Sequence, residues 1–501
     1  MTRLYTTQLK YVLPIALLYS AISLAGMFHH EIFGEEAQQL TIGRDSSSVI
    51  DVYKNMLYEG HVTLWNTLLF FITHYVSAHP MYMQLFHLLV ISCAMYLFLR
   101  YAPFDLPVKV LIIFGCYFLF VYSIVCRNYA LGILLLFAGC ILMANPGRNM
   151  IRIGLVVVLM CFTHLFYVFA AVGIFLYLLV YVRGKRELYR RFVVFTCLFL
   201  FGAVSAVFET LRIPADSIVH IKKGLSWLNF DDISFGIRCF VRGYITNPPT
   251  NVQYFWDKQY VQTLSDNTNM ILAVLLFAAT LLFLRKSRKA ILFYVPPVIF
   301  LSAFFTITGA AGTRYFGLYF IFFIAALWLA YYDGVTIFPK GNPGFIRKWG
   351  PRAFIYIILI DQLFTGVYMY RKDFRAPFSQ ANNTVSYLKA NHLDTDFLAV
   401  DGYCPTLSAY LGKKTFYLNT DQYGSFCIWK RAYIPNPRRS LMDEISSSKQ
   451  IKNFKTFILI SNRTNEVNNN GTWQFNKLAS FEGAIIEGED YYIYKATKKI
   501  N

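Results

Sequence analysis

Long apolar blocks separated by short polar stretches fill the first three quarters of the chain. Most blocks run for about 17 to 25 residues, the length that a helix needs to cross about 30 Å of hydrocarbon. The pattern predicts about eleven transmembrane helices in an α-helical polytopic membrane protein. We place them at residues 11–28, 82–99, 108–125, 128–144, 150–163, 165–182, 192–211, 268–284, 290–309, 315–332 and 353–370.

One apolar stretch, at residues 62–76, is interrupted by polar side chains and is not counted as a span. If it crossed the membrane, every later loop would change sides, and the basic loops would face outward against the positive-inside rule. We therefore predict a juxtamembrane or re-entrant helix here, within a first outer loop at 29–81. A second short helix is predicted just before it, because residues 49–57 place apolar side chains at helical spacing.

Composition supports this architecture and changes how the net positive charge of the chain is interpreted. The chain is 56% hydrophobic and only 15% charged, whereas soluble domains carry about 25% charged residues. A formal net charge of +19 would suggest a nucleic-acid partner in a soluble protein, but here Lys and Arg lie mainly in short loops between apolar blocks. The positive-inside rule accounts for them if the N-terminus is cytoplasmic, so we expect no nucleic-acid partner.

Two hydrophilic regions interrupt the apolar pattern. The outer loop at 212–267 mixes aromatic side chains with basic residues such as Lys222 and Lys223. These either anchor the loop among lipid headgroups or hold a lipid phosphate or glycan acceptor. Residues 371–501 have the composition of a small outward-facing α/β soluble domain, which follows a transmembrane module at 1–370. The chain contains no Walker loop and no G-x-G-x-x-G, so we assign no nucleotide binding.

Cys404 and Cys427 fall in this outward tail, where a disulfide is chemically permitted. The sequence leaves open whether they pair or remain free thiols. Asp361 lies inside the last predicted span. An acid within the membrane suggests a function by default, but its position at mid-span, away from the other candidate residues, favours a structural pairing inside the bundle.

Two adjacent carboxylates, Glu35 and Glu36, directly follow the first span. Acids are costly beside hydrocarbon, so such a pair is expected to face a water-filled site. One acid could act as the general base that takes a proton from an acceptor hydroxyl, and a carboxylate of Glu36 or Asp45 could hold a divalent cation. The alternative is that the pair merely caps the next helix.

Arg127, His164 and Arg314 come from different segments but are predicted at the same outer depth. Arginine binds a phosphodiester through a planar fork of donors, so two of them beside acids suit a substrate with a phosphate leaving group. The alternative for each residue is an interfacial anchor or a partner for a nearby carboxylate.

In their order along the chain and their predicted side of the membrane, these motifs resemble the GT-C glycosyltransferases. The similarity is greatest to the bacterial branch with the lipid A aminoarabinose transferase and the Rhizobium lipopolysaccharide galacturonosyltransferases; the protein O-mannosyltransferases are more distant. Glu35-Glu36 stand where the family has Asp-Glu, and Glu59-Gly60-His61-Val62 resembles its Glu-Gly-His-Pro, with Val62 in place of proline. The remaining matches are Arg127-x-Tyr129 and Arg314-Tyr315.

The resemblance implies a multi-pass transferase that moves a sugar from a polyprenyl-phosphate carrier to a lipid, glycan or protein acceptor of the cell envelope, usually with inversion. It implies Glu35 or Glu36 as the base, and Arg127 and Arg314 facing the carrier phosphate. It also favours the bacterial inner membrane, with the C-terminal domain in the periplasm. For the substrate site it also suggests Tyr129, Tyr315, His61 and Glu59. We add His164 and Asp45, which the sequence places in the same outer region.

Two other classes of function remain open from the sequence. A glycolipid flippase would also need a basic outward cavity, but we find no pair of broken helices in matched halves of the chain. A non-catalytic assembly protein with the same fold would tolerate neutralisation of both Glu35 and Glu36, whereas an enzyme would lose most of its rate.

Overall fold

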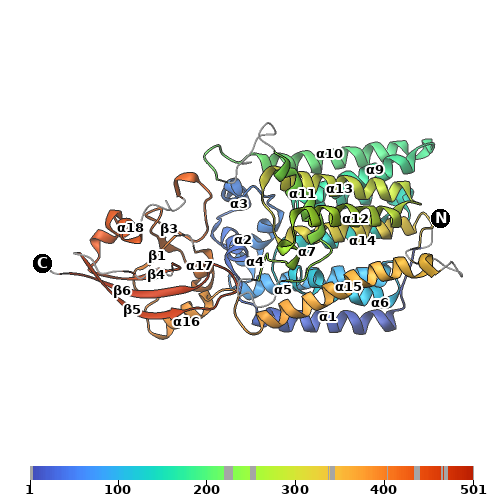
Figure 1. Ribbon diagram of the computed structural model, residues 1–501. Helices are drawn as coiled ribbons and strands as arrows, with labels where there is room; N and C mark the ends of the chain where they lie inside the picture. The colour runs from blue at the N-terminus through green and yellow to red at the C-terminus, as the bar shows by residue number, and fades with distance from the viewer. Residues whose placement is uncertain are drawn as a thin grey trace.

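The computed structural model has a bundle of long helices at one end and a small mixed sheet at the other (Figure 1). It describes residues 4–218, 229–248, 255–336, 338, 345–402, 404–433, 440–463, 467 and 472–499, without the side chains of 346–348. Within these ranges, eight helices are long and apolar enough to cross a membrane. They are α1 (Leu9–His29), α5 (Pro80–Tyr101), α9 (Leu165–Val182), α10 (Tyr189–Leu211), α12 (Asp266–Leu284), α13 (Arg288–Thr308), α14 (Thr313–Tyr331) and α15 (Phe345–Asp373).

The other three predicted spans are shorter or broken. Helix α7 (Tyr129–Leu142) has 14 residues and α8 (Pro146–Cys161) has 16. The span predicted at 108–125 is not one continuous helix: α6 (Leu106–Ile113) ends early, and a π-helical turn, η2 (Tyr117–Val121), follows it. Irregular backbone is tolerated at membrane depth where protein buries it, and η2 is wholly buried.

The first outer loop forms the two predicted short helices, α3 (Val49–Asn55) and α4 (Leu64–Tyr75), and one more helix before them, α2 (Gly34–Asp45). All three lie between the bundle and the sheet (Figure 1). Helix α4 has 12 residues and is therefore about 18 Å long, too short to span the hydrocarbon. Its close contact with α2 depends on Gly43, where an added Cβ would lie 2.9 Å from the Phe70 nitrogen.

The large outer loop is described in part. It contains an amphipathic helix, α11 (Phe230–Arg242), which begins with a capping box between Asn229 and Asp232. Lys222 and Lys223 lie outside the described residues. The backbone N–H and hydroxyl of Thr246 donate to Asp361 at 2.7 and 3.1 Å, so the structural pairing predicted for Asp361 is confirmed.

The C-terminal domain is a six-stranded mixed sheet in the order β3-β2-β1-β4-β6-β5. Strand β1 is parallel to β2 and β4, and the remaining pairs are antiparallel. The predicted α/β domain is therefore confirmed as a fold. The strands are β1 (Leu398–Val400), β2 (Thr415–Tyr417), β3 (Gln422–Gly424), β4 (Thr456–Ser461), β5 (Trp473–Phe481) and β6 (Tyr491–Lys498).

Helices cover both faces of this sheet. Alternate residues of β1 point to opposite faces, so Leu398 packs with α16 (Ala381–Ala390) and α17 (Pro405–Leu411), and Ala399 packs with α18 (Leu441–Ser447). The bundle and the sheet therefore have separate hydrophobic cores. The N-terminus lies at the end of the bundle away from the sheet (Figure 1).

Candidate functional site

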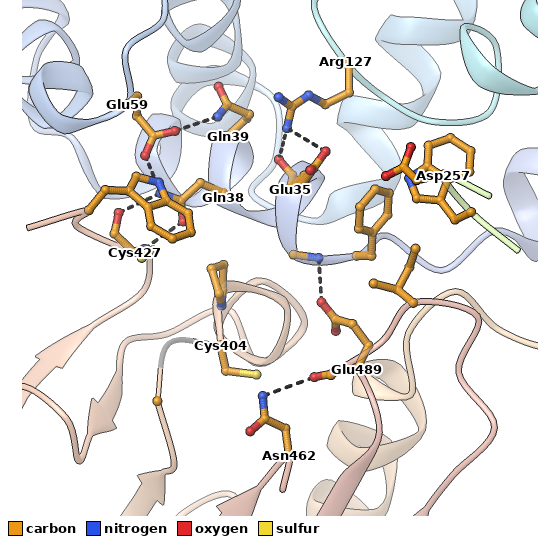
Figure 2. A pocket seen from close by; sticks show the side chains of 18 of the residues that line it. Glu35, Gln38, Gln39, Glu59, Arg127, Asp257, Cys404, Cys427, Asn462 and Glu489 are labelled. Atoms are coloured by element: carbon orange, nitrogen blue, oxygen red, sulfur yellow. Dashed lines mark hydrogen bonds and ion pairs between the residues drawn. The ribbon is translucent and has the colours of Figure 1, made fainter. Parts of the chain in front are cut away.

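A cavity of about 1000 Å³ lies where the helical bundle meets the C-terminal domain (Figure 2). Its walls come from the first half of α2, from the segments that begin α7 and α14, and from loops at the carboxyl ends of β1 and β4. This volume is at the upper end of typical small-molecule sites. The charged residues that line it are Glu35, Glu59, Asp257, Asp401, Glu489, Arg127, Arg314 and Arg463.

Glu35 lies in the first turn of α2, and its side chain is 37% exposed. Its Oε1 is 2.7 Å from Nη2 of Arg314, at the start of α14, and its Oε2 is 3.8 Å from Nη1 of Arg127, just before α7. Arg127 also donates to the main-chain carbonyl of Glu35 at 2.6 Å. Two arginines from distant parts of the chain therefore meet one carboxylate in the cavity.

Glu36 points away from the cavity and is fully buried. Its Oε1 accepts the Cys126 N–H at 2.6 Å, and its Oε2 accepts the Phe33 N–H at 3.2 Å and lies 3.0 Å from Nε2 of His30. The other ring nitrogen of His30 is 3.0 Å from Asp373. Burial opposes the charge on His30, but the carboxylates of Asp373 and Glu36 raise its pKa to about 10. Both oxygens of Glu36 are thus engaged in holding the fold.

Asp45 lies at the far end of α2 and outside the cavity lining. It accepts from Arg44 Nε at 2.7 Å and from the Ser425 hydroxyl. Glu36 and Asp45 are separated by about 13 Å along the helix axis, so they cannot share one cation. No group of three or more His, Cys, Asp or Glu side chains in the described parts of the chain is placed to hold a metal ion. The geometry gives neither candidate ligand an open position for a cation.

The two predicted imidazoles lie at different depths. His61 lines the cavity, and burial, aided by Arg127 and Arg314, lowers its pKa to about 3. His164 lies behind it, with a distance of 5.3 Å between the ring centroids. Its side chain caps α9, and its Nε2 is 3.2 Å from the Tyr129 hydroxyl. His164 and Tyr129 therefore form a layer behind the wall, and His61 faces the cavity as an uncharged group.

Glu59 fixes α2 from the side of the first outer loop. Its two carboxylate oxygens accept from the side-chain amides of Gln38 at 2.8 Å and Gln39 at 3.2 Å, and burial raises its pKa. Gln38 also forms a reciprocal pair with the main chain of Cys427, at 2.7 and 2.8 Å (Figure 2). Glu59 therefore lines the cavity but is already bonded to the helix that carries Glu35.

Tyr315 lines the cavity beside its neighbour Arg314. The Arg314 Nη2 donates to the Tyr315 hydroxyl at 3.0 Å, and the guanidinium carbon lies 4.5 Å from the centre of the tyrosine ring. The predicted Arg-Tyr pair thus places an arginine and an aromatic ring on the same wall, where the ring limits the positions that the guanidinium can take.

The C-terminal domain supplies wall residues that no sequence motif predicted. Glu489 accepts the Gly34 N–H at 2.7 Å through Oε1 (Figure 2). Its Oε2 accepts the Ser379 and Tyr491 hydroxyls, each at 2.7 Å. Burial raises the pKa of Glu489. Gly34 begins α2, so this domain directly holds the turn that contains Glu35.

Three further wall residues complete the charged lining. Asp257 accepts the Thr313 N–H at 2.6 Å, next to Arg314. Its neighbour Trp256 also lines the cavity. An aromatic residue beside an acid in the large outer loop was the sequence signal that could have indicated Asp257 as a wall residue. Arg463 Nη2 is 2.8 Å from Asp401 Oδ1.

Cys404 and Cys427 both line the cavity and are both buried free thiols. The disulfide that the sequence left open is therefore not formed. Burial raises the pKa of both thiols, so both are uncharged near neutral pH.

Comparisons with known proteins leave the family open. No family model matches the chain, and no curated protein sequence matches it. Among solved structures, the chain is similar to the crystal structure of ArnT from Cupriavidus metallidurans bound to undecaprenyl phosphate. The identity is 12%, the match covers 97% of this chain and 98% of that one, and the TM-score is 0.47. A likeness at this level is too weak to assign a family, an activity or residue roles.

Proposed function

We propose that this multi-pass membrane protein is a glycosyltransferase. It would move a sugar from a polyprenyl-phosphate carrier to a lipid, glycan or protein acceptor on the outer face of the membrane. The observation that carries the proposal is the partly exposed carboxylate of Glu35, held between Arg127 and Arg314 in a large cavity. A base beside two guanidinium groups suits deprotonation of a hydroxyl next to a phosphate leaving group.

In the proposed reaction, Glu35 takes the proton of the acceptor hydroxyl, and the hydroxyl oxygen attacks the anomeric carbon of the sugar. The bond from that carbon to the phosphate oxygen breaks with inversion, and polyprenyl phosphate leaves with the bonding electrons. Arg127 and Arg314 stabilise the charge on the departing phosphate through charge-assisted hydrogen bonds. The reaction needs no nucleotide.

The contact between Arg314 and Glu35 gives the reaction an order. A guanidinium at 2.7 Å occupies a carboxylate oxygen that the acceptor hydroxyl would have to reach. A carrier phosphate offers the same fork of donors a second acceptor. Binding of the donor would draw Arg314 from Glu35 and free that oxygen to accept a hydrogen bond from the acceptor hydroxyl, so the donor is expected to bind before the acceptor reacts.

The position of the cavity also suits an amphiphilic donor. Glu35 follows shortly after α1, and Arg314 lies in the first turn of α14, so both charges lie near the ends of transmembrane helices. A carrier with its hydrocarbon tail in the bilayer could present its phosphate at this depth. The opposite wall, formed by the C-terminal domain, is then available to the acceptor.

The test is the mass profile of surface glycans and glycolipids in a deletion strain of the source organism. The strain is complemented with wild type, with Glu35→Gln, or with the control Glu187→Gln, which changes an exposed acid in the turn between α9 and α10. We expect wild type and the control to restore a missing sugar, and Glu35→Gln at equal membrane abundance to fail. A restored profile with Glu35→Gln would overturn the proposal and favour a flippase or an assembly protein.

A further inference from the structure

A second cavity, of about 440 Å³, lies at the opposite end of the bundle, where the N-terminus is also found (Figure 1). Helix α9 runs from His164, next to the candidate site, to this cavity at Arg183. With 18 residues, it separates the two by about 27 Å. The charged residues that line this basic cavity are Arg183, Lys185, Lys286, Arg288, Lys289 and Asp333.

Five cations face a single acid in the basic cavity, and the acid is already paired. Asp333 Oδ1 is 2.5 Å from Nζ of Lys289, and its other oxygen accepts from the Ser287 hydroxyl. Within the described part of the chain, Arg183, Lys185, Lys286 and Arg288 have no carboxylate partner; Lys185 lies over the Tyr181 ring. The cavity therefore keeps an uncompensated positive charge on four side chains from two different connections.

The local backbone adds to this field. Ser287 caps α13 by accepting the Ala290 N–H, so the positive end of the α13 dipole points toward the cluster. The positive-inside rule accounts for basic residues in these loops, but it does not require them to surround one cavity. Arg148 and Arg152, on α8 at the same end of the bundle, are exposed and do not line it.

We propose that the basic cavity binds the phosphate of an anionic phospholipid headgroup. Lysine and arginine are the side chains that recognise phosphodiesters, and basic pockets between transmembrane helices bind anionic headgroups. Val180 and Tyr181 form the apolar part of the wall, where a glycerol backbone or the start of an acyl chain can pack. The site is separate from the proposed glycosyltransferase centre and does not depend on it.

The test counts phosphatidylglycerol molecules retained by the purified full-length protein, using native mass spectrometry in neutral detergent. Lys286→Gln combined with Arg288→Gln removes two exposed, unpaired charges from the cavity. The matched control, Arg148→Gln combined with Arg152→Gln, removes the same charge from the same end of the bundle. Retention should fall about tenfold or more in the first variant and stay near wild type in the control.

Equal losses in the two variants would show general surface attraction, and no loss in either would show that the cavity is not a lipid site; both results overturn the proposal. The charge-conserving pair Lys286→Arg and Arg288→Lys should retain the lipid, which separates lost charge from lost folding. Millimolar inorganic phosphate should leave the lipid bound. Displacement by phosphate would overturn the lipid assignment in favour of a free-phosphate site.

Discussion

The first turn of helix α2 places one glutamate on its cavity side and one on its bundle side, and the two have different surroundings. Glu35 is partly exposed and contacts two arginines in the cavity, whereas Glu36 is fully buried and has protein partners on both oxygens. Successive residues of an α-helix are rotated by about 100°. Adjacent acids in a sequence are therefore not a functional pair when they begin a helix between a cavity and a packed bundle.

The two sides also differ in what a substitution should disturb. A carboxylate at the edge of water loses little solvation and can change its partner with a bound substrate. Removal of a buried carboxylate that accepts from main-chain N–H groups leaves those donors unsatisfied. Variants on the cavity side should therefore change the rate of reaction, and variants on the bundle side should change stability.

The largest expected effect is on the cavity side. Glu35→Gln should lower kcat for sugar transfer by about 10²- to 10⁴-fold, the usual contribution of a general base. The unfolding temperature should stay near that of wild type, because the side chain is partly exposed. Initial rates and thermal unfolding of the purified protein check both expectations. A stable and fully active Glu35→Gln protein would remove Glu35 from the reaction.

On the bundle side, Glu36→Ala should destabilise the protein by about 3–5 kcal/mol, because it removes a buried acceptor from two main-chain N–H groups and from His30. The substitution leaves the Cys126 N–H without its acceptor, and Asp373 remains as the carboxylate partner of His30. Membrane abundance and thermal unfolding, compared with the exposed control Glu187→Ala, measure this effect. Wild-type stability with lost activity would reverse the roles of the two acids.

A smaller effect is expected where the C-terminal domain holds α2. Glu489→Ala removes the acceptor of the Gly34 N–H and should cost about 1–3 kcal/mol, the penalty for a buried donor left unsatisfied. It should also lower kcat more than it changes KM for the donor, because it loosens the turn that places Glu35. Glu489→Gln keeps an oxygen for Gly34 and should recover part of the rate. Identical behaviour of the two variants would argue against positioning.

The last test changes the pH in place of a side chain. The pKa of His30 is raised from 6.5 to about 10 in the folded protein, so its contribution to stability is complete below pH about 6.5 and is lost as the pH rises toward 10. The unfolding temperature of wild type should fall over that range. The fall should be less steep in His30→Gln, and equal slopes would show that the histidine is not held charged.

The sequence predicted the positions of the helices better than it predicted which of their faces are buried. Hydrophobic periodicity located the long helices and the short helix at residues 64–75, because both signals are local. It could not show the break before Tyr117, because that break lies where α15 packs closely: a Cβ on Gly366 would come within 3.0 Å of the Cys116 backbone. Such a contact joins residues far apart in the chain.

The candidate site shows the same limit of local signals. Arg127 and Arg314 were predicted at one depth because each opens a helix on the same side, and both reach Glu35. The sequence could not separate Glu35 from Glu36, since the rotation of α2 depends on its packing against the bundle. His30, six residues before Glu36, was an available but unused signal for the buried partner. No sequence signal indicated Glu489, because only the folded sheet brings it to Gly34.

The bonds between α2 and the C-terminal domain have a consequence for protein engineering. Besides the contacts at Gly34 and Gln38, Arg44 donates to the Ser408 carbonyl at 2.7 Å near the other end of the helix. The domain is thus attached along the whole length of α2. A chimaera that exchanges this domain for that of a relative would need to carry the matching α2 with it, and a truncation after α15 would remove these bonds from the helix.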